Sequence, residues 1–214
     1  LDDPDSPREV ASLPLADARA IAVAGTVACV ADGERGVVVL DVSDPRAPRV
    51  TGVRYLQDPR SVAMSSDVAY VACGTGGVRL VDISDPRSPE RLGVVASEDA
   101  HELCLSAGRL LVADEVAGLR VYDFASPASP RLVSELALAG ARGVSARGAR
   151  AVVLTAAGFS IVDLGDPAHP AVMTTIEQTV SCAMMADDGY AIVAGRSGVA
   201  VLDTAEPTGR PIDT

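Results

Sequence analysis

The sequence contains no tryptophan, and aromatic residues make up only 3% of its 214 positions. Hydrophobic residues nevertheless make up 48%, so the interior must be filled by valine, alanine, leucine and isoleucine. Small and β-branched side chains of this kind suit tightly stacked β-sheets. Because a chain of this length can bury one large all-β core, the composition favours a single all-β domain.

Long apolar runs and a positive net charge are also lacking. The longest apolar stretches, such as Gly36 to Leu40, are far shorter than the roughly 20 residues that span a bilayer. The 29 acidic and 18 basic side chains give a net charge of −11, whose field repels a polyanion at long range. We therefore expect neither a membrane span nor a nucleic-acid partner.

The four cysteines, Cys29, Cys73, Cys104 and Cys182, show no CxxC spacing. They indicate neither a zinc site nor a disulfide framework. The glycine-rich segment CGTGG lacks the lysine of a phosphate-binding loop. The sequence thus predicts no metal site and no cofactor.

One phrase recurs five times, as VVVLDVSDPRAP, VRLVDISDPRSP, LRVYDFASPASP, FSIVDLGDPAHP and VAVLDTAEPTGRP. Its anchor aspartates, 41, 41, 40 and 40 residues apart, are Asp41, Asp82, Asp123, Asp163 and Asp203. This period is typical of a four-stranded propeller blade, which has about 40–45 residues. In the first unit, alternation and turn residues predict strands at Arg19–Ala24, Val27–Ala31, Val37–Val42 and Arg49–Tyr55.

The two ends of the chain supply complementary parts of one repeat. Residues 8–15 match the fourth strand of a unit, while the fifth unit stops after its third strand. Pairing Val10–Leu15 with Val199–Asp203 would complete a fifth blade and remove exposed sheet edges. The sequence therefore predicts one domain over residues 1–214, a closed five-bladed β-propeller of four-stranded antiparallel blades.

The segments GVRLVDISDPRSP, GVVVLDVSDPRAP and DVAYVACGTGG resemble the LVIVD-repeat family of bacterial and archaeal proteins. The resemblance covers essentially the whole chain, with departures at LTAAGFS and LDTAEPTGRP. It implies a β-propeller used for binding, without a general catalytic activity, in a secreted, periplasmic or cell-surface protein. The residues alone leave the compartment open, the cytoplasm included, and a start at Leu1 fits either a trimmed or a mature form.

In a propeller blade, the loop before the first strand and the loop between the second and third strands lie on one face, around the channel mouth. Aligning the first of these loops places five residues at one position: Arg19, Arg60, His101, Arg142 and Cys182. Arginine offers planar, bidentate donors that suit carboxylate or phosphate, so this ring is a candidate anion site. Asp32 and Asp114, in the second set of loops, are candidates for binding a ligand or orienting the arginines.

A structural interpretation of the same ring is also open. Three of its members follow an acidic residue by two positions, namely Asp17, Asp58 and Asp99. Each cation can therefore be neutralised by its own or a neighbouring blade. Gly140 replaces the acid before Arg142, which predicts that Arg142 is the member available to a ligand. The repeated anchor aspartates are predicted to accept backbone N–H bonds in the following turn, since calcium needs about 6 to 8 converging oxygens.

These features favour a non-enzymatic propeller that presents its loop face to a protein or small ligand. A lectin-like or small-anion-binding propeller is the alternative. A hydrolase at the same mouth is disfavoured, because the chain has two histidines and no closely spaced acid and base recur. Cys182 and His101 belong to non-adjacent repeats, which also disfavours a Cys–His pair. A closed ring has no edge that needs a partner, so we expect a monomer.

Overall fold

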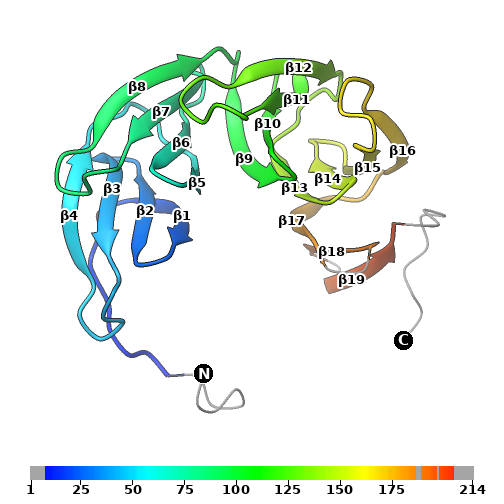
Figure 1. Ribbon diagram of the computed structural model, residues 1–214. Helices are drawn as coiled ribbons and strands as arrows, with labels where there is room; N and C mark the ends of the chain where they lie inside the picture. The colour runs from blue at the N-terminus through cyan, green and yellow to red at the C-terminus, as the bar shows by residue number, and fades with distance from the viewer. Residues whose placement is uncertain (1–7, 187–188, 197, 205–214) are drawn as a thin grey trace.

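The computed structural model describes residues 8–186, 189–196 and 198–204. Their strands form five antiparallel sheets, four with four strands and one with three. Each sheet is a blade, and blades one to five follow one another around a central opening (Figure 1). Blade one comprises β1 (Ala18–Ala24), β2 (Val27–Asp32), β3 (Gly36–Asp41) and β4 (Arg49–Arg54). These bounds agree to within one residue with the strands predicted from alternation.

The remaining blades repeat this order from the inner to the outer strand. Blade two comprises β5 (Ser61–Ser65), β6 (Val68–Ala72), β7 (Val78–Asp82) and β8 (Glu90–Val95). Blade three comprises β9 (Ala100–Ser106), β10 (Arg109–Asp114), β11 (Gly118–Asp123) and β12 (Arg131–Leu136). Blade four comprises β13 (Gly143–Arg147), β14 (Arg150–Leu154), β15 (Phe159–Asp163) and β16 (Ala171–Ile176). Blade five comprises β17 (Val180–Met185), β18 (Tyr190–Gly195) and β19 (Gly198–Asp203).

The second and third strands of each blade carry the core. In blade one they read VACVAD and GVVVLD and are buried almost throughout, as expected of strands covered on both faces. Neighbouring blades pack face to face: Cys29 and Val39 of blade one contact the layer that contains Val62 and Val71 of blade two. Cys29 is fully buried, as predicted, and burial raises the pKa of its thiol to about 12. It is therefore a packing residue.

Glycine is required where the third strand begins. Gly36 and Gly118 have φ values of +95° and +94°, which side-chain-bearing residues rarely adopt. A Cβ on Gly36 would lie 2.2 Å from the backbone nitrogen of Leu56, and one on Gly118 would lie 2.3 Å from the carbonyl oxygen of Leu136. The glycines thus let the loop between the second and third strands approach the loop before the next blade.

The inner strands are also linked from blade to blade. The backbone N–H of Leu103 donates to Ser61 Oγ over 3.3 Å, that of Val144 to Glu102 Oε2 over 3.1 Å, and that of Met185 to Ser145 Oγ over 3.0 Å. Each bond joins one inner strand to the inner strand of the next blade. These bonds help to fix the radius of the channel mouth.

Four of the five repeated anchor aspartates have the structural role that was predicted for them, while the turn after the fifth, Asp203, lies outside the described residues. Their Oδ1 atoms accept the backbone N–H two residues further on, over 2.8 to 2.9 Å, in Asp41, Asp82, Asp123 and Asp163. Hydrogen bonds from the side chain and backbone of Ser43, and from Arg49, lower the pKa of Asp41 to about 2. The carboxylates are thus engaged in turns spread around the fold.

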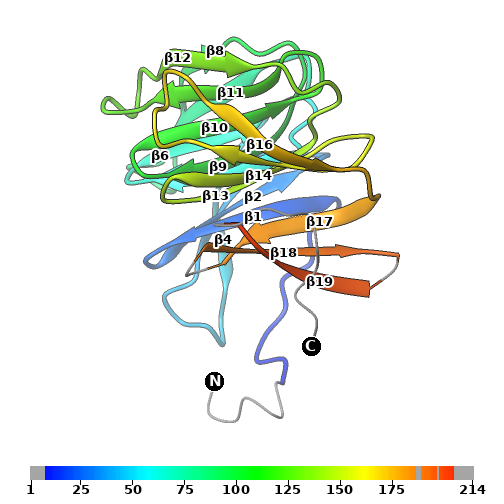
Figure 2. The ribbon, with the colours of Figure 1, turned by 90° about the vertical axis from the view of Figure 1, so that its right-hand side faces the viewer.

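The predicted pairing of Val10–Leu15 with Val199–Asp203 is not present in this structure, and the ring is open between blades five and one (Figure 1). Residues 8–15 form no strand; in Figure 2 they are the dark-blue segment that leads into β1. Leu13 and Leu15 instead pack against Val30 and Leu40 of blade one. Burial of these leucines accounts for the position of the segment without any pairing to β19.

The described residues offer no helix with the length and apolar character of a membrane span.

Candidate functional site

Two of the predicted mouth residues occupy a β-bulge. Ala18 pairs with Asp32 and Ala20 with Ala31, so Arg19 is the extra residue at the start of β1. His101 is the extra residue at the start of β9 in the same way. A bulge re-aims its side chain, and it brings both residues to the mouth of the opening.

Arg19 lies between two carboxylates from different blades. Its Nη2 is 2.8 Å from Asp17 Oδ2 of its own leading loop, and its Nη1 is 3.2 Å from Asp58 Oδ1 of blade two. Arg60 repeats the arrangement one blade further on. Its Nη2 is 2.8 Å from Asp58 Oδ2, and its Nη1 is 2.8 Å from Asp99 Oδ1 of blade three. Asp58 therefore bridges two arginines of successive blades.

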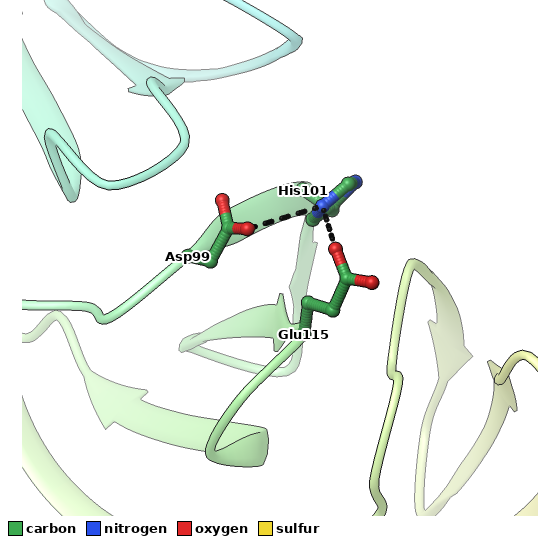
Figure 3. A group of neighbouring side chains, drawn as sticks. All are labelled: Asp99, His101 and Glu115. Carbon is green, nitrogen blue, oxygen red and sulfur yellow. Dashed lines mark hydrogen bonds and ion pairs between the residues drawn. The ribbon is translucent and has the colours of Figure 1, made fainter.

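The row continues through blade three to blade four. His101 Nε2 is 2.8 Å from Glu115 Oε2, and Glu115 Oε1 accepts hydrogen bonds from the guanidinium of Arg142. Figure 3 shows Asp99 and Glu115 on two sides of His101. Acidic residues thus alternate with arginine or histidine across four blades without interruption. We call this set the mouth row; it comprises Asp17, Arg19, Asp58, Arg60, Asp99, His101, Glu115 and Arg142.

The ion pairs shift the acidities of the carboxylates. For Asp58, burial opposes ionisation, yet the hydrogen bonds from Arg60 and Arg19 leave its pKa lowered. The hydrogen bond from Arg142, followed by that from His101, lowers the pKa of Glu115. Both acids are therefore charged at neutral pH and hold their cations in place.

His101 Nε2 has two competing neighbours. Arg60 Nη1, which can only donate, is 2.7 Å away, whereas the ionised Glu115 carboxylate, which can only accept, is 2.8 Å away. A lone pair at Nε2 would accept from Arg60, and an N–H at Nε2 would donate to Glu115. The two contacts therefore require opposite roles of the same ring nitrogen.

One imidazole nitrogen and two carboxylates converge within 4.8 Å at Asp99, His101 and Glu115. Such donors are compatible with a divalent cation. Here, however, Asp99 is paired with Arg60 and Glu115 with Arg142. A metal ion would have to displace two guanidinium groups, so the geometry favours the ion pairs.

Several expectations for the mouth are corrected by the structure. Arg142 was predicted to lack a carboxylate partner, but Glu115 of the preceding blade supplies one. Cys182 does not occupy the position of the four cations: Val180 pairs with Gly195 and Cys182 with Ala194, so the bulged residue is Ser181. The sequence alignment of this loop was one residue out of register, because Ser181 follows Arg142 by 39 residues, whereas the earlier members of the ring are 41 residues apart.

Asp32 and Asp114 lie at the predicted loops, as the last residues of β2 and β10, but they are not open to a ligand there. Both are fully buried. Asp32 accepts the backbone N–H groups of Glu34 and Arg35, and Asp114 accepts those of Val116 and Ala117. Hydrogen bonding to the backbone outweighs burial, so the pKa of each is lowered. These acids hold the loops around the mouth and do not face a ligand.

Glu115 is the mouth residue that sequence reasoning missed. The loop in which it lies, DEVAG, places an acid directly after the buried Asp114, where blades one and two have Gly33 and Gly74. The available signal was this extra acid, because its loop borders the mouth. It also lies one blade before Arg142, the cation without an acid of its own.

Comparison with known proteins supports this architecture. The LVIVD repeat family matches residues 16–53, 58–96 and 140–177, which correspond to blades one, two and four. Among curated proteins none matches the sequence significantly.

Solved structures with a similar fold share little sequence with the chain. The WD40 beta propeller domain of Doa1 superposes with a TM-score of 0.70 at 15% identity, over 92% of this chain and 67% of that one. A protein from Lactobacillus plantarum gives 0.72 at 16% identity, over 89% and 69% of the two chains. The computationally designed Ika8 protein gives 0.72 at 10% identity; 92% of this chain is covered, but it spans only 60% of the Ika8 chain. The fold is that of a β-propeller, and because the family match covers more than half of the sequence, the chain belongs to the LVIVD repeat family.

Proposed function

We propose that this chain is a non-enzymatic binding module that presents the loop face around the channel mouth to a protein partner. A propeller is a rigid scaffold whose loops are displayed together at one face. The observation that carries the proposal is the mouth row, in which acidic residues alternate with arginine or histidine across four blades.

The pairing within the mouth row supports one partner class over the other. A small anion would need cations that lack carboxylates, whereas Arg19, Arg60 and Arg142 each have one. A protein surface can match several charges of both signs at once, and such complementarity supplies specificity and speeds association. The paired row therefore favours a protein partner at the mouth over a lectin-like or small-anion ligand.

The test compares two variants on opposite faces of the same protein. Arg142→Ala removes the most exposed cation of the mouth row, with 55% of its side chain accessible. Arg46→Ala removes an exposed arginine from the SDPRAP turn of blade one, at the other end of the strands. Proteins captured by the wild type would be purified, and their affinity for all three forms measured by biolayer interferometry. Weaker binding by Arg142→Ala alone supports the proposal, and equal loss with Arg46→Ala contradicts it.

Catalysis at the mouth is the competing function. His101 is its one imidazole, so a hydrolase there would depend on it. The wild type and His101→Gln would be compared on ester, phosphoester and glycoside substrates. Turnover that disappears in His101→Gln would show that the mouth is catalytic.

We also propose that the open ring closes by bringing β17–β19 onto residues 10–15. Val95, at the end of β8 in blade two, packs against blade three, and Leu136, at the end of β12 in blade three, packs against blade four. Leu13 packs against blade one in the same way. The segment that contains Leu13 therefore lies where the fourth strand of a preceding blade would lie. β19 exposes Val199 by 71% and Val201 by 38%, as an edge without its outer neighbour would. The closed form is proposed to be a monomer, which light scattering after gel filtration would test.

Export to the periplasm or cell surface is proposed from the family resemblance, and fractionation of the source cells would test it.

A further inference from the structure

A second group of arginines, none of them part of the mouth row, lies at the rim between blades one and two. Arg54 at the end of β4, Arg79 on β7 and Arg91 on β8 line a pocket of about 200 Å³ together with Tyr55, Leu56 and Gln57. In the described part of the chain, none of the three arginines has a carboxylate or other hydrogen-bond partner. Three like charges therefore line one small pocket of a protein whose net charge is −11.

Blade three contains the matching position and shows how the fold neutralises an arginine there. Arg120 lies on β11 as Arg79 lies on β7, one repeat earlier. Its guanidinium is 3.0 Å from Glu135, 3.7 Å from Glu98 and 3.8 Å from the buried Asp114. It also donates to the carbonyl oxygen of Ala96 over 2.8 Å. Three carboxylates thus compensate one arginine at the rim between blades two and three.

Blade two lacks all three of these acids. Arg79 pairs across its strands with Val94, where Arg120 pairs with Glu135. Counting one repeat back, Gln57 replaces Glu98 and Cys73 replaces Asp114. Blades two and three therefore differ here in their acidic side chains and not in their sheets, because the strands and their register are the same in both blades.

Two further arginines have been added at the same place. Arg54 stands where blade two has the buried Val95, and Arg91 stands where blade three has Leu132. The rim between blades two and three thus has one arginine with three acids. The pocket at the rim between blades one and two is lined by three arginines and no acid. Mutual repulsion of the guanidinium groups makes the second arrangement unfavourable unless an anion from solution enters it.

We infer that this rim pocket binds a phosphate or sulfate group carried by a small molecule. Three guanidinium groups suit a tetrahedral anion of charge −2 better than a single carboxylate, and each can donate charge-assisted hydrogen bonds to its oxygens. The aromatic ring of Tyr55, 72% exposed at the pocket, offers an apolar contact for the remainder of the ligand. The site is separate from the mouth row and does not depend on the function proposed for it.

Calorimetry with inorganic phosphate and with sulfate at low ionic strength would test the inference, with sodium chloride at equal ionic strength as the reference. The wild type should bind one anion per chain. Arg79→Ala and Arg91→Ala should each weaken binding by about tenfold or more, since a hydrogen bond to a charged group is lost. A preference for phosphate or for sulfate identifies which ester the natural ligand carries.

Two further variants separate this site from others. Gln57→Glu combined with Val94→Glu restores the acids that Arg120 has, so it should abolish anion binding while the circular dichroism spectrum stays unchanged. Arg142→Ala, in the mouth row, should leave anion binding unaltered. The inference is overturned if the wild type binds neither anion, if Arg79→Ala and Arg91→Ala bind as the wild type does, or if binding is lost in Arg142→Ala instead.

Discussion

The carboxylate of Glu115, in blade three, holds the guanidinium of Arg142, in blade four. This pair is the last contact of the mouth row. It supplies a carboxylate partner to the cation that has no acid two positions before it in the sequence. Glu115→Gln should consequently change the mouth more than it changes the fold, because ion pairs at exposed positions contribute little to stability.

Two measurements, one of stability and one of anion binding, test Glu115→Gln. Its thermal unfolding midpoint should stay close to that of the wild type, while calorimetry should reveal weak, salt-sensitive anion binding at the mouth that the wild type lacks. Arg142→Ala in the same background is the control and should remove the new binding. A large loss of stability in Glu115→Gln would show instead that the pair is structural.

The anchor aspartates should behave as turn residues. Asp82→Ala removes the acceptor for the backbone N–H of Ser84 and is expected to cost about 1 kcal/mol of unfolding free energy. Urea titration followed by circular dichroism measures this, and Asp82→Asn, which keeps an acceptor oxygen, should recover part of it. Loss of partner binding without any loss of stability would contradict the assignment.

Asp114 should be far more sensitive than Asp82. It is fully buried and accepts hydrogen bonds from Ser97 Oγ and from the backbone of Glu98, Val116 and Ala117. Asp114→Ala leaves several buried donors unpaired, so we expect a loss of about 3 kcal/mol or more. Equilibrium urea unfolding would measure it, and a loss below that for Asp82→Ala would show that water replaces the carboxylate.

Stability should fall with acid. The folded-state pKa values of Asp41 and Asp58 are lowered, so the unfolded chain takes up protons before the folded chain does. Their contribution is complete above the unfolded value of about 4 and is lost as the pH falls through the folded values, which for Asp41 is about 2. Urea unfolding between pH 7 and pH 3 should show this decline, and Asp41→Asn should reduce its slope. A constant free energy over that range would refute the ion-pair account.

The closure proposal makes a prediction for truncation. A chain that starts at Asp17 loses Leu13 and Leu15, which cover Val30 and Leu40 of blade one. Exposed apolar surface and an unpaired edge on β19 should then cause self-association. Light scattering after gel filtration would detect it. A truncated chain that stays monomeric and melts with the full chain would rule out closure by this segment.

The strands of the first blade could be predicted to within one residue, and the repetition of blades could be predicted because alternation, glycine and SDP turns recur at a fixed period. The turn role of Asp82 followed from its repetition. Register at the mouth could not be predicted in the same way, since the spacing between blades is not constant at this position. The step from Arg142 to the next mouth position is 39 residues instead of 41, so Ser181 and not Cys182 continues the row.

The sequence predicted that a cation can be neutralised by its own or a neighbouring blade, which Arg19 and Arg60 confirm, but it did not identify each partner atom. The spacing shows Asp58 beside Arg60, but not that its second oxygen reaches Arg19. Glu115 is 27 residues from Arg142 along the chain and was paired with it only by the stacking of blades three and four. The absence of acids around Arg79 became meaningful only beside Arg120, once both strands were in register.

The mouth row also divides the ring into two parts that are held together differently. Its ion pairs link blades one to four at the mouth, and it ends at Arg142 because the next position is Ser181, which carries no charge. The step from blade four to blade five is made instead by the hydrogen bond from Met185, at the end of β17, to Ser145 and by a packed apolar layer. Salt therefore screens the links among the first four blades at the mouth, whereas the described contacts between blades four and five are uncharged.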